Sequence, residues 1–167
     1  MGLAYWVLYL ILFDTSPLVF CVSELSWTAS YIFLALRLYA DIPKEKQKEK
    51  AVFWILPAFS FAMCIFFYTR GSYFENILMG TAMGVLGYYA VKGICLAKIQ
   101  NCFGKPLIFY AALFFYAAEY LLWISSYFIT ENIFVNPYYL VDILILNPAL
   151  ILIAVAQSKE DKLCHTI

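Results

Sequence analysis

Lysine and arginine residues fall on alternate sides of the long apolar runs in this chain, and this regularity constrains its fold more than any other feature. Ten of the eleven Lys and Arg residues lie in three segments: after the second apolar run, between the fourth and fifth runs, and at the end of the chain. Arg70 lies between the third and fourth runs, on the opposite side of the membrane in this pattern. Short cytoplasmic loops of membrane proteins carry an excess of Lys and Arg. The pattern predicts a multi-pass protein of the plasma (inner) membrane, with the loop at 130–136 outside. The segments predicted to be cytoplasmic are 37–50, 92–105 and 159–167.

Composition supports this assignment. The chain is 65% hydrophobic and 13% charged, with a mean hydropathy of +0.81, whereas soluble domains are roughly 45–50% apolar and about 25% charged. Too few polar side chains remain to cover a water-exposed surface. The formal net charge is zero, and the lysines of 44–50 alternate with Glu45 and Glu49, so nothing favours binding to nucleic acid. We expect an all-α integral membrane protein.

Prolines and polar clusters divide the chain into helical segments. Pro17, Pro106 and Pro137 each open an apolar run, and proline is favoured at the first position of a helix because its missing N–H is not needed there. No long polar stretch remains between the runs, so residues 1–167 are predicted to form a single polytopic transmembrane domain with no separate soluble domain. The predicted segments are 3–13, 17–40, 51–68, 74–91, 106–129 and 137–156.

The first segment decides the number of transmembrane helices. It has eleven residues, whereas a helix that crosses a bilayer needs about 20. If residues 3–13 cross, the chain is a compact bundle of six transmembrane helices with both termini in the cytoplasm. If they do not cross, the bundle has five helices and the N-terminus is outside. We favour six, and the C-terminus is cytoplasmic in either case.

A short internal similarity relates the two halves of the chain. Glu24 is followed by a Trp one turn later and by a Ser-Tyr pair two turns later, and Glu119 is followed by the same residue types at slightly different spacing. Under the predicted topology these two helices run in opposite directions. The similarity favours a 3+3 inverted repeat of the kind found in transporters, with chance similarity in a chain rich in Tyr, Ser and Trp as the alternative. The matching residues are Trp27, Ser30 and Tyr31 in the first helix and Trp123, Ser126 and Tyr127 in the second.

Three acidic residues, Glu24, Glu119 and Asp142, lie within the predicted spans. A charged Asp at the centre of a membrane helix costs about 2.5–3.5 kcal/mol even on the mildest scale. All three acids are expected in the outer half of the bilayer, where no Lys or Arg is predicted at the same depth. Such carboxyl groups are protonated, hydrogen-bonded to Ser, Tyr or Trp groups of neighbouring helices, or turned toward a water-filled cavity that receives a cation.

The third arrangement would make an outward-facing acidic pocket. Aromatic and hydroxyl residues share a helical stripe with each Glu, and an aromatic face beside a carboxylate suits a cationic ligand. In the last span, Asn147 precedes Pro148, which removes a backbone hydrogen bond and is predicted to free carbonyl groups near Ile143 and Leu144. The alternative, in which the acids serve as hydrogen-bonding groups between helices, stays open. The predicted ligand-binding or ion-binding residues are Glu24, Trp27, Tyr31, Glu119, Trp123, Ser126, Asp142 and Asn147.

Small residues mark one face of the fourth predicted helix. Gly80, Gly84 and Gly87 recur at spacings that place them along that face, and small residues let two membrane helices approach closely. The pattern predicts that this helix is the central packing helix of the bundle. A sliding or hinge face is the functional alternative.

Residues suited to metal binding or catalysis are scarce. The five cysteines show no C-x-x-C spacing, and His165 is the one histidine available to join them, so no metal site is predicted. The sequence also has no Ser/His/Asp set, no H-E-x-x-H helix and no glycine loop placed to bind phosphate. No catalytic residue and no cofactor is predicted.

Three functions are compatible with these features, in this order of preference. The first is a transporter or solute-binding membrane subunit that holds a cation, a proton or a small cationic solute in the acidic pocket. The second is a non-transporting membrane module, such as a sensor input, an immunity subunit or an assembly subunit, which acts through a membrane-protein partner. The third is a membrane-embedded lipid hydrolase that uses paired carboxylates, so an enzyme is the least favoured class. The lipid bilayer is a partner in all three.

Overall fold

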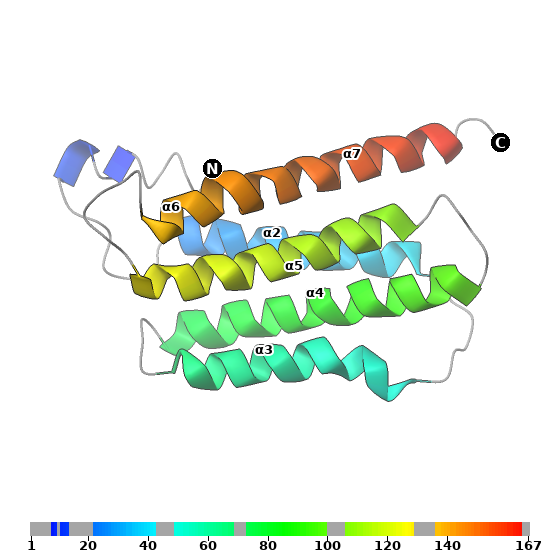
Figure 1. Ribbon diagram of the computed structural model, residues 1–167, viewed down its shortest axis with the longest axis horizontal. Helices are drawn as coiled ribbons and strands as arrows, with labels where there is room; N and C mark the ends of the chain where they lie inside the picture. The colour runs from blue at the N-terminus through cyan, green and yellow to red at the C-terminus, as the bar shows by residue number, and fades with distance from the viewer. Residues whose placement is uncertain are drawn as a thin grey trace. The chain divides into compact units, whose positions relative to one another are not determined.

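A computed structural model describes residues 8–9, 11–13, 22–42, 49–68, 73–99, 106–128 and 136–164 of the chain. Nearly all of these residues are helical, and none of them belongs to a β-strand (Figure 1). The prediction of an all-α fold is confirmed. Backbone polar groups in an apolar environment are satisfied within the helix that contains them, which is why so hydrophobic a sequence forms helices.

The helices group into two compact units. The first unit covers Met1–Tyr88 and the second covers Tyr89–Ile167, so the boundary falls inside the long helix α4 (Tyr73–Ile99). That residues 1–167 form one polytopic domain stays a prediction.

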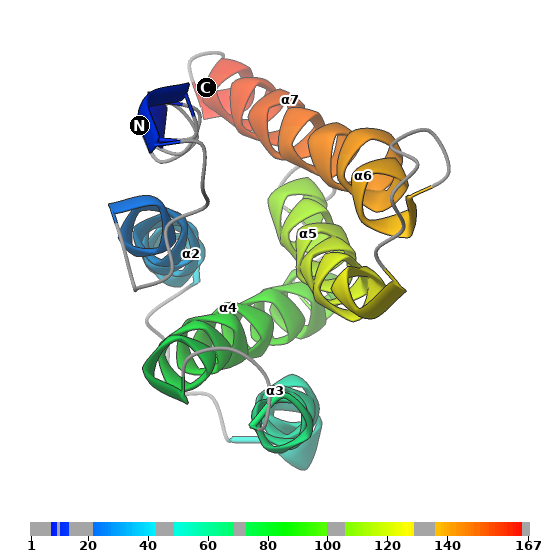
Figure 2. The same cartoon turned by 90° about the vertical axis from the view of Figure 1, so that its left-hand side faces the viewer.

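The first unit contains α2, α3 and the N-terminal part of α4. Helix α2 (Val22–Asp41) contacts α4 at Thr28, whose hydroxyl donates to Met79 Sδ at 2.9 Å. A 3₁₀ turn, η1 (Ala51–Trp54), leads into α3 (Ile55–Phe66), which lies beside α4 and runs antiparallel to it (Figures 1 and 2). The buried apolar residues of this unit include Tyr31, Ala35, Leu38, Phe53, Met79 and Met83.

The C-terminal end of α3 is closed by Asn76 of α4. The last carbonyl groups of a helix have no partner within that helix. The Asn76 Nδ2 group donates to the Phe67 carbonyl at 2.8 Å, and the Cys64 thiol donates to the Asn76 carbonyl at 3.3 Å. These two hydrogen bonds tie the end of α3 to the first turns of α4 and stabilise the hairpin that the two helices form.

Small residues on α4 allow α3 to approach closely. A Cβ atom placed on Gly80 would lie 2.0 Å from Cys64 Sγ, which is far closer than real Cβ atoms come to such an atom. A Cβ atom on Gly84 would have its nearest neighbours on α3 at 3.6 Å, which is ordinary van der Waals contact. Gly87 is also buried. Gly80 is therefore the glycine at which the packing of α3 on α4 requires the absence of a side chain.

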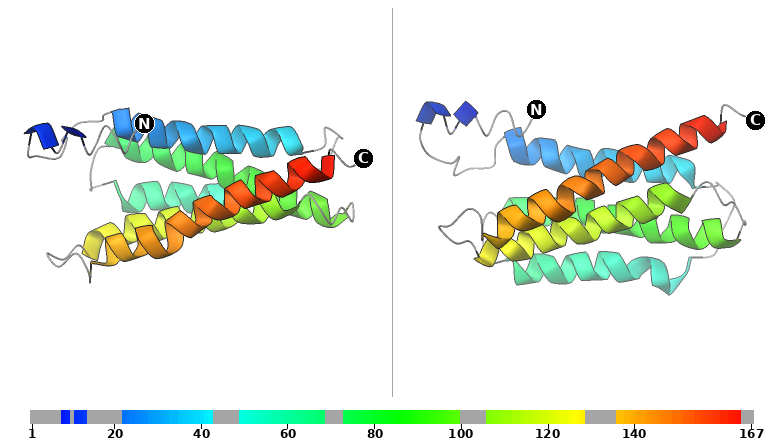
Figure 3. Two further views of the ribbon diagram at one scale, coloured as in Figure 1. Left: turned by 90° about the horizontal axis from the view of Figure 1, so that it is seen from above. Right: turned by 45° about the horizontal axis from the view of Figure 1, so that its top comes forward.

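The second unit contains the C-terminal part of α4 and the helices that follow it. Helix α5 ends in the short 3₁₀ turn η2, and α5 packs against α6, a π-helical turn η3, and α7. Together α6, η3 and α7 form one helical rod that runs antiparallel to α5 (Figure 3). The bounds of these elements are Pro106–Ser125 for α5, Ser126–Phe128 for η2, Pro137–Val141 for α6, Asp142–Leu146 for η3 and Asn147–Cys164 for α7.

Two helices are longer than the sequence predicts. The predicted ends are residues 91 and 156, whereas α4 continues to Ile99 and α7 continues to Cys164. Neither extension contains a proline. Residues 92–99 include Lys, Ala and Leu, and residues 157–164 include Gln, Lys, Glu and Leu, all of which have high helix propensity. Helical hydrogen bonding therefore continues beyond the point at which the apolar run ends.

Among the described residues, three helices are long and apolar enough to cross a membrane, and Ala51–Phe66 forms a shorter apolar helix. Helix α2 has 20 residues but includes Glu24 and the ion pair of Arg37 with Asp41. Only parts of the predicted segments 3–13 and 17–40 lie within the described residues. A bundle of six transmembrane helices therefore stays a prediction. The three candidate spans are Tyr73–Ala97, Leu107–Phe128 and Pro137–Lys159.

Replacing Gly80 by Ala is expected to destabilise the first unit, because the new methyl group would overlap Cys64 Sγ. Overpacking of this kind costs about 1–3 kcal/mol. Gly80→Ala should lower the midpoint of thermal unfolding in detergent micelles. Adding Cys64→Ala should recover most of that loss relative to Cys64→Ala alone, since it removes the overlapping sulfur.

Gly84→Ala is the matched control for this experiment. It brings the same gain in helix propensity, but its methyl group would meet α3 at ordinary contact distance. Its midpoint should stay within error of the unsubstituted chain or rise slightly. Equal losses in Gly80→Ala and Gly84→Ala, or no recovery in the double variant, would contradict this account of the packing.

Candidate functional site

On α2, the structure gives different surroundings to side chains that the sequence places on one stripe. Tyr31 is 4% exposed, whereas Trp27 is 39% exposed. The Glu24 side chain lies outside the described residues, although its backbone is helical. The part of Trp27 and Tyr31 in a ligand site stays a prediction.

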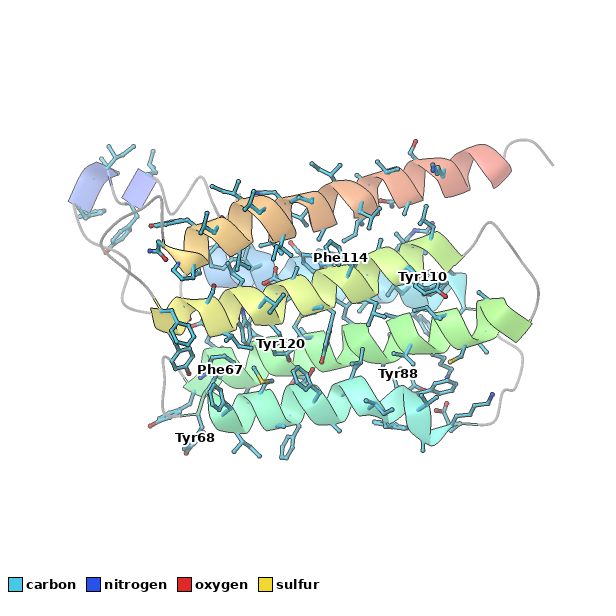
Figure 4. The ribbon with its side chains drawn as sticks, in the orientation of Figure 1. Phe67, Tyr68, Tyr88, Tyr110, Phe114 and Tyr120 are labelled. Atoms are coloured by element: carbon cyan, nitrogen blue, oxygen red, sulfur yellow. The ribbon has the colours of Figure 1, made fainter. Side chains whose placement is uncertain are left out.

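Glu119 lies on α5 and is 6% exposed, which makes it the one buried acidic side chain among the described residues. Beside it, three aromatic rings form a row along the same helix. The rings of Tyr116 and Tyr120 have centroids 4.9 Å apart, and those of Tyr120 and Trp123 are 5.5 Å apart, both in edge-to-face geometry. Figure 4 labels Tyr120 within this part of α5. Trp123, a predicted site residue, thus contributes to this aromatic row.

Asn136 sets the position of α6, which follows it. Its side-chain oxygen accepts a hydrogen bond from the Tyr138 N–H at 3.0 Å, and its backbone carbonyl accepts one from the Leu140 N–H at 3.1 Å. Pro137 occupies the first turn of the helix, where its missing N–H costs nothing. Asn136 is 3% exposed. This buried N-cap sets where α6 begins, and it therefore sets the positions of the Tyr138 and Asp142 side chains, which lie one turn apart.

Two acidic side chains from separate helices act on one phenol. The carboxyl groups of Asp142 and Glu119 both interact electrostatically with the Tyr138 side chain. Asp142 lies one turn after Tyr138 on the same rod, whereas Glu119 belongs to α5, which packs against that rod. We refer to Glu119, Tyr138 and Asp142 as the acid–phenol cluster. The structure thus places two of the predicted acids within electrostatic range of one phenol in the second unit, and their role as ligands stays a prediction.

Tyr138 is not among the site residues predicted from the sequence. The signal available for it is the Asn-Pro start of α6, which places Tyr138 and Asp142 at i and i+4 on one helical face. Its meeting with Glu119 depends on which helices pack together, and residue spacing within one segment does not specify that.

The backbone beside the cluster departs from α-helical geometry. Asp142 begins the π turn η3, and the Asn147 N–H donates to the Asp142 carbonyl, five residues earlier. The next residue, Pro148, offers no N–H to Ile143 or Leu144, and its ring would clash with the carbonyl four residues before it. The predicted disturbance at this proline therefore takes the form of a π turn, a feature found frequently at functional sites.

Ser126 and Asn147 are two further predicted site residues. The Ser126 hydroxyl donates to the Trp123 carbonyl at 2.6 Å, and the neighbouring Ser125 hydroxyl donates to the Leu122 carbonyl at 2.7 Å. Both bonds satisfy carbonyl groups at the C-terminal end of α5. The Asn147 side chain is exposed.

Within the part of the chain that the structure describes, no group of three His, Cys, Asp or Glu side chains is arranged to hold a metal ion. Cys64 and Cys95 are free thiols in this part. The acid–phenol cluster contributes two carboxyl groups and one hydroxyl group. Its chemistry therefore suits transfer of a proton or loose binding of a cation.

No family model, curated protein or solved structure matches this chain. The case for a function therefore rests on the chemistry of the cluster and on the helices that hold it.

Replacing Tyr138 by Phe is expected to change the vibrational spectrum of the Glu119 carboxyl group, because the substitution removes a polar group that interacts with that carboxyl. The measurement is infrared difference spectroscopy across a pH titration of the protein in lipid vesicles. The Glu119 band is assigned by its loss in Glu119→Gln.

Tyr110→Phe is the matched control, since Tyr110 lies on α5 with Glu119 but is 44% exposed. It should leave the Glu119 band in place. A Glu119 band that is identical in both variants and in the unsubstituted chain would show that Tyr138 and Glu119 do not interact.

Proposed function

We propose that the chain is a multi-pass membrane protein that binds a proton or a small cation at the acid–phenol cluster, as a transporter or as a solute-binding membrane subunit. In this proposal it has six transmembrane helices and lies in the plasma (inner) membrane, with both termini in the cytoplasm. One observation carries the proposal: Glu119, only 6% exposed, lies with Asp142 within electrostatic range of the Tyr138 phenol.

The chemistry of such a pair favours a shared positive charge. An ionised carboxylate in apolar surroundings is costly unless it is paired, protonated or hydrogen-bonded. The Glu119 and Asp142 carboxyl groups both lie within electrostatic range of the Tyr138 phenol, and in this proposal their protonation is coupled. A single proton held between Glu119 and Asp142, or a single cation, removes this cost. The Tyr138 hydroxyl can donate to whichever carboxylate keeps its charge.

The π turn links a change of charge at the cluster to a change in the conformation of the α6–α7 rod. Asp142 is the first residue of η3, and its own carbonyl closes the turn. Helices interrupted near the middle of the membrane are a recurring element of ion-coupled transporters, where backbone carbonyls and side chains coordinate the ion. Binding at the cluster would therefore act directly on the least regular part of the α6–α7 rod.

Glu119→Gln and Asp142→Asn are expected to reduce cation flux at least tenfold, because each removes one of the two groups that share the charge. The measurement uses proteoliposomes that contain a pH-sensitive dye, with proton, sodium, potassium and methylammonium gradients applied in turn. Glu75→Gln, at the start of α4, serves as the control and should keep the unsubstituted flux. If both cluster variants match the unsubstituted chain for every ion, the cluster does not carry transport.

A second function, that of a non-transporting module that acts through a partner, is favoured by the exposure of the last span. Only 17% of Pro137–Lys159 is buried, against 56% for each of the other two candidate spans. Ile143, Leu144 and Ile151 are each 60% exposed or more. A membrane helix with so much exposed apolar surface can pack against a helix from another protein.

A photocrosslinking residue at Ile151 distinguishes the two functions. If the chain is a module that acts through a partner, irradiation in native membranes should yield an adduct with a second membrane protein. The same residue placed at Ala149, which is fully buried, is the control and should give no such adduct. Adducts with lipid alone at Ile151 would exclude a partner on this face.

A further inference from the structure

The hairpin of α3 and α4 carries an aromatic group at the end where η1 begins. The Tyr88 ring lies 5.3 Å from the Trp54 ring and 6.1 Å from the Phe53 ring, and its hydroxyl donates to Glu49 Oε2 at 2.8 Å. Phe53 is 1% exposed, whereas Trp54 is 59% exposed. The 3₁₀ turn therefore directs one ring into the protein and the next ring outward.

A second aromatic group lies at the opposite end of the hairpin. The rings of Tyr68 and Tyr73 stack with centroids 4.7 Å apart, and both residues are more than half exposed, at 56% and 57%. Figure 4 shows Phe67 and Tyr68 at one end of α3 and Tyr88 near the other end. Trp and Tyr are the residues enriched at the two membrane–water interfaces.

Between these ends, the outer face of the hairpin is apolar. Its inner face is made of small groups, with Gly80 lying against Cys64 and Gly84 against Ser60. Many large apolar side chains of the two helices are exposed. Those more than 40% exposed include Ile55, Phe59, Phe61, Ile65 and Phe66 on α3 and Phe74 and Ile77 on α4.

The α3 arm of the hairpin is short for a bilayer, whereas α4 continues beyond the hairpin to Ile99. The four residues of η1 and the twelve of α3 rise about 26 Å at roughly 2.0 and 1.5 Å per residue, and a typical hydrocarbon core is about 30 Å thick. At about 1.5 Å per residue, Trp54 and Tyr68 are about 21 Å apart along α3, and Tyr73 and Tyr88 are about 22 Å apart along α4. The two helices thus give the same separation between the aromatic groups.

We propose that this outer face contacts lipid directly and that the bilayer beside it is thinned to match the distance between the two aromatic groups. The inference rests on the membrane location in the proposed function and adds to it a local membrane thickness. Charge complementarity supports a lipid occupant, because exposed Lys50 precedes Trp54 and the run 44–50 holds four lysines against two glutamates. Anionic lipid phosphates attract such lysines. A helix shorter than the membrane is accommodated by thinning the bilayer, at a cost that grows with the mismatch.

The test is the stability of the full-length chain in bilayers of different thickness. Vesicles of phosphatidylcholine with phosphatidylglycerol are prepared with myristoleoyl, oleoyl or erucoyl chains. The midpoint of thermal unfolding should be highest in the myristoleoyl vesicles and should fall with each longer chain. A midpoint that is constant or rises with chain length would overturn the inference.

Depth-dependent fluorescence quenching tests the position of Trp54 independently. In a chain with Trp6, Trp27 and Trp123 replaced by Phe, bromine atoms near the lipid headgroup should quench Trp54 more strongly than bromine atoms near the bilayer centre. Stronger quenching from the centre would overturn the inference even if the protein is inserted. If carbonate washing instead strips the unsubstituted chain from the vesicles, the membrane location and the proposed function fail together.

Trp54→Leu tests the aromatic end itself in the unsubstituted background. It should lower the midpoint in myristoleoyl vesicles more than Trp27→Leu does, because Trp27 is exposed on α2 and lies outside both aromatic groups. Equal losses in the two variants would show that Trp54 is no interfacial anchor.

Discussion

A backbone N–H or C=O group in apolar surroundings must find a partner within the protein, and this requirement organises the chain. Helices satisfy it along their length but leave carbonyl and N–H groups open at their ends. In the described residues, side chains meet this need at several ends: Asn76 donates to a carbonyl at the end of α3, Asn136 caps α6, and Ser125 and Ser126 donate to carbonyls at the end of α5. These polar side chains thus serve the ends of helices.

Once the backbone is satisfied, helices in lipid gain little from the hydrophobic effect when they associate, so close fit has to hold them together. The glycines of α4 show this in both units. Gly80 lies where Cys64 leaves no room for a Cβ atom, and Gly93 lies where a Cβ atom would come within 2.1 Å of the Phe109 ring. The group that leaves no room for a Cβ atom differs between the two glycines: it is a small thiol in one unit and a large aromatic ring in the other.

Local features of the fold are predictable from the sequence, and features that depend on helix pairing are not. Pro106 and Pro137 predict helix starts, and helices begin at both residues, because the fixed φ of proline and its missing N–H act within one turn. The disturbance before Pro148 is predictable for the same reason, but its π form is not. The meeting of Glu119 with Tyr138 depends on the packing of α5 against α6, which spacing along one helix does not encode. The wider site that includes Glu24 stays a prediction.

The position of Pro148 relative to Asp142 limits how the second unit can respond to a change in charge. Pro148 supplies no N–H and displaces the carbonyl four residues earlier, so a regular α-helix cannot form through this point whatever the charge of Asp142. The ring of Pro148 therefore restricts the backbone conformation on the α7 side of the turn. On the other side, α6 has five residues and depends on the Asn136 cap. Under the proposed function, a change in charge at Asp142 would therefore be accommodated more easily by α6, which carries Tyr138, than by α7.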